Sequence, residues 1–157
     1  MKTAPSILRT AFYRDHAHLL CSSYRHWTGE RLLNAGDPSE DLAGQLYAAP
    51  FGIVSHGTEA DPIFNFGNAV ALGLFEMSWE AFTRLPSRES AEPIGREERA
   101  ALLARVSGAG FIDDYRGVRI SASGRRFVIE RASVWNLIDE MGTHRGQAAK
   151  LDKWSYL

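Results

Sequence analysis

The chain has a single cysteine and no long uninterrupted run of apolar residues. Among its 157 residues only Cys21 is a cysteine, so the sequence predicts no internal disulfide and no cysteine-based zinc site. Arg9, Arg14 and Asp15 interrupt the N-terminal segment, which predicts neither a signal peptide nor a membrane-spanning helix. We therefore expect a cytoplasmic protein with no membrane partner.

A field of basic charge is also missing. Lys and Arg number 18 against 19 Asp and Glu, the formal net charge is −1, and Arg125-Arg126 is only a pair. Nucleic-acid binding needs clustered positive charge, so we expect no nucleic-acid partner. The composition, 45% hydrophobic and 24% charged, is typical of one globular domain of ordinary size.

Recognisable catalytic motifs are absent as well. The sequence has no Gly-x-Ser-x-Gly elbow, no phosphate-binding loop and no zinc-ligand spacing. Asp113 and Asp114 are adjacent on a predicted strand, where neighbouring side chains point to opposite faces. His56 and Asp61 bracket a loop and are interpreted as loop polarity. We predict no catalytic residues, no metal site and no enzyme, and an uncharacterised enzyme is the least favoured alternative.

Residues 63–82 carry the clearest local pattern in the chain. An apolar strand over residues 63–66 leads to Asn68, which is expected to cap a short helix through Phe75. Ser78 is expected to cap a second helical turn that carries Trp79 and Phe82. This segment is predicted to be the centre of a small-molecule-sensing or partner-binding domain.

The N-terminal part is predicted to be helical. Residues 6–27 form an amphipathic helix with an apolar stripe of Leu8, Phe12, Leu20, Tyr24 and Trp27. His16 falls on this stripe and suits a ligand or pH switch, although a buried histidine with a hydrogen-bonded neighbour is the favoured interpretation. A second helix is predicted over residues 37–49, because Asp37, Pro38 and Glu40 form a helix start.

The remainder predicts a hairpin, further helices and a strand meander. Strands are expected over residues 51–55, 63–66, 111–120, 125–139 and 147–154, and a helix over residues 95–106. Glu97, Glu98 and Arg99 are expected to start that helix partly in solvent. Both faces of the strand over residues 125–139 are mostly apolar, so both are predicted to be covered. The N-terminal stripe is expected to cover one of them, in its own chain or in a dimer mate.

This order of elements resembles the PAS fold. Its pattern of an aromatic, Asn, small residues and an apolar helix is similar to Phe66-x-Asn68-Ala69-x-Ala71-Leu72-x-Leu74-Phe75, and its turn between long strands is similar to Ser123-Gly124-Arg125-Arg126-Phe127. More narrowly, the chain resembles bacterial stand-alone members of the MEKHLA family, through Leu74-Phe75-Glu76, Leu85-Pro86-Ser87-Arg88, Asp114-Tyr115-x-Gly117-Val118-Arg119-Ile120, Val134-Trp135-x-Leu137-Ile138-Asp139 and Gly146-Gln147-Ala148-Ala149. That PAS-related family also forms the C-terminal region of plant class III homeodomain-leucine zipper proteins.

The resemblance implies an α+β fold: a PAS-like five-stranded antiparallel sheet with helices on one face. We expect residues 50–157 to form this domain and residues 1–49 to be a helical extension that packs on the sheet or on a dimer mate. The resemblance also implies a ligand between sheet and helices, walled by Phe64, Phe66, Leu72, Phe75, Trp79, Phe82, Phe111, Tyr115, Phe127, Ile129, Arg131 and Trp135. Arg131 is expected on the face of Phe127 and Trp135, where a buried arginine needs an anion or, more favoured, an internal carboxylate.

Two functions stay open. The chain is a signalling module that binds an unidentified small molecule or a protein partner, or a dimerisation module whose aromatic side chains fill the core and leave no cavity. Flavin photochemistry is not expected, because Cys21 lies far upstream of the helices that would hold it. Haem is not expected either, because no histidine lies between His56 and His144 and only Met77 offers an axial ligand. The cofactor or ligand stays unassigned.

Overall fold

The computed structural model describes residues 3–33, 41–91 and 93–157, and for residues 93–96 the backbone alone. Its centre is a five-stranded antiparallel sheet in the order β2-β1-β5-β4-β3. The strands are β1 (Gly52–His56), β2 (Phe64–Gly67), β3 (Phe111–Ile120), β4 (Arg126–Ile138) and β5 (His144–Tyr156). The last strand of the meander β3-β4-β5 therefore pairs with β1, the first strand of the chain. The predicted five-stranded sheet is confirmed.

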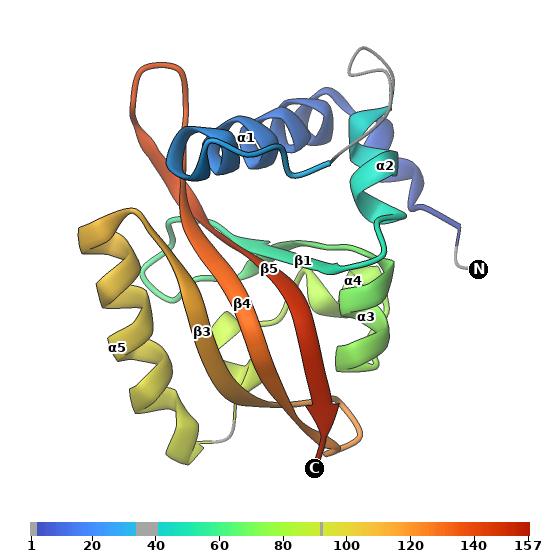
Figure 1. Cartoon of the computed structure of the whole chain (residues 1–157). Helices are drawn as coiled ribbons and strands as arrows, with labels where there is room; N and C mark the ends of the chain where they lie inside the picture. The colour runs from blue at the N-terminus through green and yellow to red at the C-terminus, as the bar shows by residue number, and fades with distance from the viewer. Residues whose placement is uncertain (1–2, 34–40, 92) are drawn as a thin grey trace.

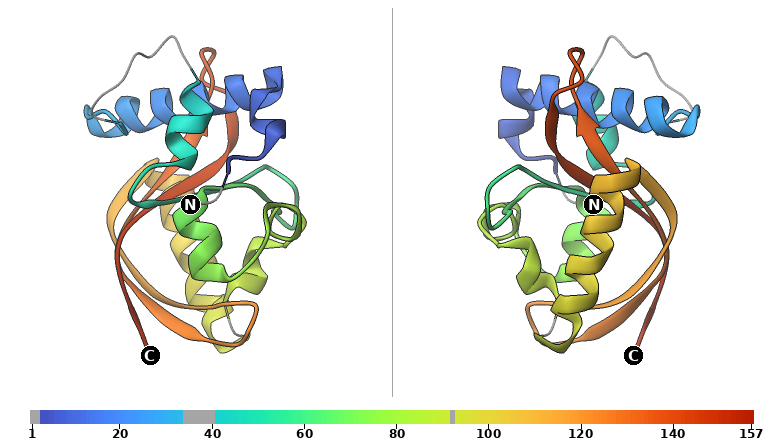
Figure 2. Two further views of the ribbon diagram at one scale, coloured as in Figure 1. Left: turned by 90° about the vertical axis from the view of Figure 1, so that its right-hand side faces the viewer. Right: turned by 90° about the vertical axis from the view of Figure 1, so that its left-hand side faces the viewer.

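The helices lie on both sides of this sheet (Figure 1). The inner face is covered by α3 (Ala69–Phe75), α4 (Trp79–Phe82), the 3-10 turn η2 (Ser87–Ser90) and α5 (Pro93–Ala109). On the opposite, outer face runs α1 (Ala11–Thr28), preceded by the 3-10 turn η1 (Ser6–Arg9) and followed by α2 (Leu42–Tyr47). Figure 2 shows the sheet curving around the inner helices while α1 stays outside.

Several predicted boundaries differ from the structure. The N-terminal helix is broken at Thr10, whose backbone is extended, so α1 begins only at Ala11. The helix start predicted at Asp37, Pro38 and Glu40 lies outside the described residues. The helix expected from residue 95 begins at Pro93, because proline suits the first helical turn. The division of the chain into domains at residue 49 stays a prediction.

Asn68 joins three elements through its buried side chain. Its Oδ1 accepts hydrogen bonds from the backbone N–H of Ala71 in α3 at 3.1 Å and of Ile53 in β1 at 2.9 Å. Its Nδ2 donates to the carbonyls of Leu46 in α2 at 3.1 Å and Phe51 before β1 at 2.7 Å. The predicted helix cap is confirmed, and the same amide also fixes α2 and β1 in place.

A bulge in β4 changes which residues face the inner helices. The pairing of β4 with β5 shifts register around Arg131, and a bulge reverses the alternation of side chains beyond it. Phe127 and Ile129 are buried on the inner face, whereas Trp135 contacts Tyr24 of α1 on the outer face, with ring centroids 4.9 Å apart. The prediction that Trp135 and Arg131 share the face of Phe127 is therefore wrong, and Arg131 is exposed.

The outer face of β4 is covered by α1 of the same chain. Ser23 donates to the carbonyl of Ile138 at 3.1 Å, and the Trp27 indole donates to the carbonyl of Asn136 at 2.9 Å. Within the predicted stripe Leu8, Leu20 and Tyr24 are buried. Phe12 is 59% exposed, because it lies at the edge of the buried face of α1, which comprises Tyr13, His16, Ala17, Leu20, Ser23 and Tyr24.

His16 is buried between α1 and the strands β1 and β2, as the favoured interpretation predicts. Its Nε2 lies 2.9 Å from the hydroxyl of Ser55, and its ring lies 6.2 Å from that of Phe66. Burial lowers the pKa of the imidazole to about 4. The ring is therefore neutral at physiological pH.

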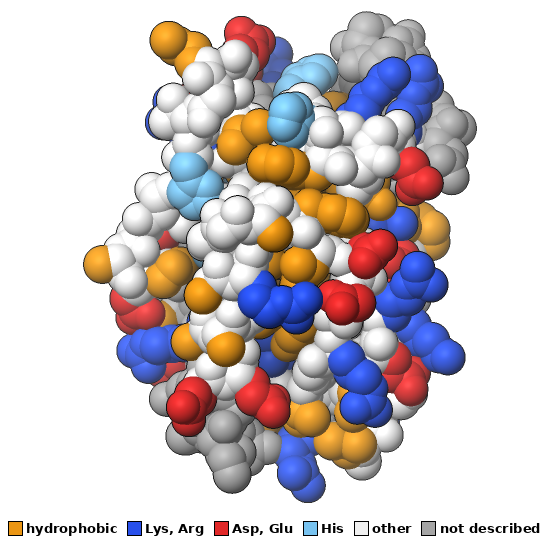
Figure 3. Space-filling view, turned by 60° about the vertical axis from the view of Figure 1, so that its left-hand side comes forward, with side chains coloured by type: hydrophobic (Ala, Val, Ile, Leu, Met, Phe, Trp, Pro, Cys, Tyr) orange, Lys and Arg blue, Asp and Glu red, His pale blue; other side chains and the backbone are white. Residues whose placement is uncertain are grey.

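The surface mixes charges of both signs. In Figure 3, Lys and Arg side chains lie beside Asp and Glu in the lower half and along the right-hand edge of the visible face, whereas its upper middle carries mainly apolar and His side chains. Arg145 pairs with Asp139 at 2.9 Å and Lys150 with Asp152 at 3.2 Å. Within the described part of the chain, no helix combines the length and apolar character that a membrane crossing requires.

Replacement of Asn68 is expected to destabilise the fold more than loss of a helix cap alone. Asn68→Ala leaves two buried N–H groups and two carbonyls without this partner, so we expect a loss of about 3–5 kcal/mol in the free energy of unfolding. Ser78→Ala is the matched control, because Ser78 only caps α4 by accepting from Ala81, and we expect about 1 kcal/mol there. Urea denaturation measures both, and equal losses would contradict the bridging role of Asn68.

His16 is expected to make the stability depend on pH between 7 and 5. The imidazole of the unfolded chain takes up a proton near its ordinary pKa of 6.5, and that of the folded chain only near a pKa of about 4, so acid favours the unfolded state. Between pH 7 and pH 5 this costs the native protein about 2 kcal/mol. Urea denaturation at the two pH values should show that His16→Gln loses about 2 kcal/mol less of its free energy of unfolding between pH 7 and pH 5 than the wild type does. The exposed control His18→Gln should behave like the wild type, and a pH dependence unchanged in His16→Gln would refute the assignment.

Candidate functional site

A cavity of ≈ 70 Å³ lies between the inner face of the sheet and α5, beside η2. Its apolar wall comes from β1, β2, α3, α5, β4 and β5, namely Val54, Phe64, Phe75, Leu102, Leu103, Ile129, Val134, Ala148, Ala149 and Leu151. Its polar part comprises Ser55, His56, Ser87, Ser90, Arg99, Tyr115, Arg119 and Gln147. The sheet and α5 thus both contribute apolar and polar side chains, and the two cationic groups come from α5 and from strand β3.

Part of the predicted ligand wall surrounds this cavity. Phe64, Phe75, Tyr115 and Ile129 line it. Phe82 stacks on Phe64 with centroids 4.2 Å apart, and Leu72 and Phe127 are buried in the core. These side chains support the wall from behind, and whether the wall binds a ligand stays a prediction.

The other predicted wall residues lie elsewhere. Phe66 and Trp79 contact each other at 5.7 Å, and Trp79 packs against Tyr13 of α1 at 5.4 Å. A register shift in the β1–β2 pair separates Phe66 from Phe64, so the two do not share a face. Phe111 is half-buried and does not line the cavity, nor do Trp135 and Arg131.

Arg99 and Arg119 are the buried cations of the site, and sequence reasoning missed both. Their exposed fractions are 9% and 8%, so the expectation that Arg99 faces solvent is wrong. The sequence held a signal for each residue. Arg99 precedes Leu102 and Val106 at helical spacing, and Arg119 follows Tyr115 by four residues on a strand, which places both on one face.

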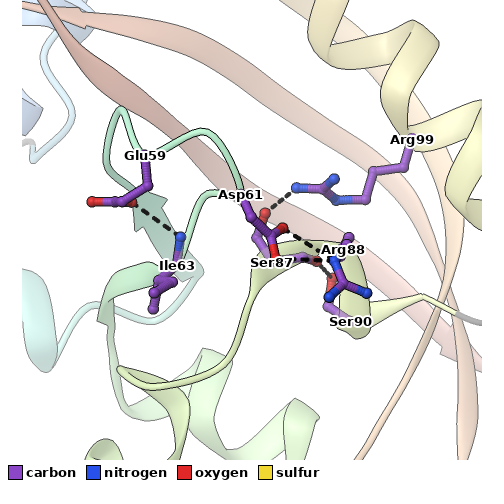
Figure 4. A network of polar contacts seen from close by, with 7 residues as sticks. All are labelled: Glu59, Asp61, Ile63, Ser87, Arg88, Ser90 and Arg99. Atoms are coloured by element: carbon purple, nitrogen blue, oxygen red, sulfur yellow. Dashed lines mark hydrogen bonds and ion pairs between the residues drawn. The ribbon is translucent and has the colours of Figure 1, made fainter.

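The two guanidinium groups have few partners in the protein. Arg99 Nη2 donates to the Ser87 hydroxyl (Figure 4). Arg119 Nη1 donates to the carbonyl of Val118 at 2.9 Å, and its guanidinium lies 5.2 Å from the centre of the Tyr115 ring. Burial lowers the pKa of Arg99 to about 10, and the positive charge of Arg119 adds to this effect. Burial also lowers the pKa of Arg119, and both side chains stay protonated at neutral pH.

The η2 turn holds Ser87 at the edge of the cavity. The backbone N–H of Ser87 donates to the carbonyl of Pro62 at 2.8 Å, and the Ser90 hydroxyl donates to the carbonyl of Ser87 at 2.7 Å. The neighbouring Arg88 points to solvent and pairs with Asp61 at 3.1 Å (Figure 4). Asp61, the carboxylate whose charge acts on Arg99, is therefore already paired with another arginine.

His56 and Gln147 complete the polar part of the site. The interpretation of His56 as loop polarity is wrong, because it ends β1 and is buried. Its Nδ1 lies 3.0 Å from the carbonyl of Gly57, which can only accept, so Nδ1 carries the proton and Nε2 is an acceptor. Within the described residues Nε2 has no hydrogen-bond partner. Burial lowers the pKa of His56, which keeps the ring neutral at physiological pH.

Gln147 connects the cavity to the opposite side of the sheet. Its amide donates to Asn136 Oδ1 at 3.0 Å, and the Asn136 amide donates to the carbonyl of Val106 in α5 at 3.1 Å. The backbone carbonyl of Asn136 accepts from Trp27 of α1 at 2.9 Å. One residue of β4 therefore binds the helices on both faces.

The donor set gives no sign of a metal or of a reactive thiol. Within residues 3–33, 41–91 and 93–157, no three His, Cys, Asp or Glu side chains gather where they could hold a metal ion. Cys21 lies on α1 and does not line the cavity, and burial raises the pKa of its thiol to about 11. A thiol with that pKa stays protonated and is a weak nucleophile. Met77 does not line the cavity either.

Curated relatives match most of this chain but only a small part of their own length. The homeobox-leucine zipper protein ATHB-9 of Arabidopsis thaliana is 27% identical over 140 residues, which are 86% of this chain and 17% of that protein. The homeobox-leucine zipper protein HOX9 of Oryza sativa subsp. indica is 26% identical over 142 residues, covering 90% of this chain and 17% of that protein. The chain thus spans about a sixth of the length of these relatives.

Solved structures share the fold at low sequence identity. The PAS domain of a Colwellia psychrerythraea protein has a TM-score of 0.63 at 15% identity and covers 77% of this chain and 98% of that one. A fungal LOV domain photoreceptor has a TM-score of 0.62 at 12% identity and covers 97% of this chain and 98% of that one. The predicted PAS-like fold is confirmed.

The family assignment follows from a match along nearly the whole chain. The MEKHLA domain profile matches residues 14–156, which include most of α1 as well as the complete sheet. The likeness to bacterial stand-alone members in particular stays a prediction. With its PAS-like fold, this chain belongs to the MEKHLA domain family.

Proposed function

We propose that this chain is a sensory module that binds a small molecule in the cavity between the sheet and α5. The observation that carries the proposal is the cavity itself, which contains buried polar groups that the protein leaves partly unpaired. A core filled only by its own side chains normally satisfies its buried polar atoms. Membership of a PAS-like family, with LOV domains among its structural neighbours, supports the same function.

The size of the cavity restricts the ligand. A single water molecule needs a cavity volume of about 10–15 Å³. The cavity volume of ≈ 70 Å³ therefore accommodates about five to seven groups of the size of a water molecule. That space suits a compact metabolite better than the three-ring system of a flavin. The proposed ligand is therefore small, and its apolar part contacts Phe64, Phe75 and Ile129.

A chain of hydrogen bonds connects the cavity to α1 on the outer face of the sheet, and through it a bound ligand could affect the position of α1. Gln147 lines the cavity, and its amide donates to the side-chain Oδ1 of Asn136. The backbone carbonyl of Asn136 accepts from the Trp27 indole of α1. A ligand that changes the position of Gln147 would shift Asn136 and so alter the hydrogen bond that holds Trp27 of α1. We propose that α1 and the segment before it transmit the signal to a partner.

A dimerisation module is the second candidate. Phe12 and Ile7 are 59% and 44% exposed, and exposed apolar side chains on the N-terminal segment suit a protein contact. In that case the functional surface is the N-terminal segment, and the cavity needs no ligand. Both candidates make a prediction about the mass of the native protein.

Native mass spectrometry of the chain purified from its own host is expected to detect a bound small molecule. Ala149→Leu should release it, because Ala149 lines the cavity on β5 and a larger side chain fills the space. Ala104→Leu is the matched control, since Ala104 is exposed on α5 and should leave the bound mass unchanged. A wild-type protein that carries no ligand and has the mass of a dimer would replace the sensory function with the dimerisation module.

A further inference from the structure

Two buried cations in one cavity need negative charge to offset them. Arg99 comes from α5 and Arg119 from β3, and both line the cavity. Among the described residues neither guanidinium forms an ion pair with a carboxylate, and Asp61 and Glu98 act on Arg99 and Arg119 only from beyond ion-pair distance. Each guanidinium has five N–H donors, and the contacts with Ser87, Val118 and Tyr115 engage only a few of them.

The local geometry keeps these cations in the cavity. Tyr115 lies beneath the Arg119 guanidinium, and its hydroxyl occupies the space that a side chain at Gly117 would fill, so that an added Cβ there would clash with it. Ser87 anchors Arg99 from η2. Side chains that served only to cover the surface would not be buried and held in this way by neighbouring residues.

His56 adds an independent pointer to a bound molecule. Its Nε2 is buried, has no hydrogen-bond partner among the described residues, and belongs to a side chain that lines the same cavity. Because Nδ1 donates to the carbonyl of Gly57, Nε2 is an acceptor that a ligand hydroxyl or amine would satisfy. An unpaired buried acceptor is uncommon in native proteins.

The apolar side chains of the cavity wall indicate which part of the ligand is apolar. Phe64, Phe75 and Leu102 are apolar and lie around the same space as the polar groups. Inorganic phosphate would leave this wall without a partner, whereas an organic acid places its carbon chain there. The geometry combines an anion-binding end, one hydrogen-bond acceptor and an apolar wall.

We propose that the cavity binds a small organic carboxylate, with Arg99 and Arg119 holding its carboxylate group and His56 accepting from a hydroxyl or amine on its short carbon chain. Paired N–H donors of arginine match the two oxygens of a carboxylate. This inference rests on the proposed sensory function, because it names the chemical class of the ligand of that same cavity.

The experiment uses the dialysed full chain and two probes of equal shape, sodium 2-hydroxybutanoate and the neutral 2-hydroxybutanamide. The carboxylate should raise the Tm with increasing concentration, whereas the amide and sodium chloride at equal ionic strength should not. Isothermal titration calorimetry then gives the Kd. Arg119→Met and Arg99→Met should each raise it at least about tenfold, through loss of a charge-assisted contact.

Arg88→Met is the matched control, because Arg88 neighbours Ser87 but points to solvent and pairs with Asp61. It should leave the Kd unchanged. Arg119→Lys keeps the charge without the paired donors and should bind the carboxylate with intermediate affinity. If a methionine variant fails to fold, this variant and the comparison of acid with amide in the wild type still decide the question.

Equal effects of acid and amide, or no effect beyond that of sodium chloride, would overturn the carboxylate assignment. If native mass spectrometry then finds a neutral molecule that Ala149→Leu releases, the sensory function stands and only the class of ligand is wrong. If no molecule is found and neither probe binds, both proposals fail.

Discussion

The buried amide of Asn68 is the contact on which the arrangement of the domain depends. Its four hydrogen bonds reach Leu46 of α2, Phe51 just before β1, Ile53 in β1 and Ala71 of α3. Because Asn68 is buried, water cannot replace the hydrogen bonds of its amide, and their loss would lower the free energy of unfolding substantially. Because β1 and α3 both contribute to the cavity wall, the same side chain that orders the fold also fixes the shape of the candidate site.

Around this fixed frame the protein keeps polar groups that its own structure does not fully satisfy. Burying Arg99 and Arg119 close to each other carries a cost that neighbouring carboxylates would normally offset. The nearby Asp61 pairs instead with Arg88 at the surface. Buried groups that remain partly unpaired are more typical of a binding site than of a core. The proposed function and the proposed carboxylate both follow from this imbalance.

Local sequence patterns were sufficient for the elements but not for the faces of the strands. The caps at Asn68 and Ser78, the hairpin and the long meander could be predicted, because each depends on residues close in sequence. The prediction that Arg131 and Trp135 share the face of Phe127 is wrong because it rests on strict alternation along β4. The bulge near Arg131 reverses the alternation, and its position depends on pairing with β5, which no local pattern reveals. Arg99 was missed for another reason, since its charge was given more weight than its helical spacing with Leu102.

The cavity between the sheet and α5 is proposed as a site for an organic carboxylate. The most direct test of this proposal is the electron density inside this cavity in a crystal structure of the chain purified from its own host. We expect density for a compact molecule with two oxygen atoms within hydrogen-bond distance of Arg99 and Arg119 and a third polar atom near His56 Nε2. A cavity that holds only water, or side chains of Arg99 and Arg119 that turn outward to pair with surface carboxylates, would contradict it.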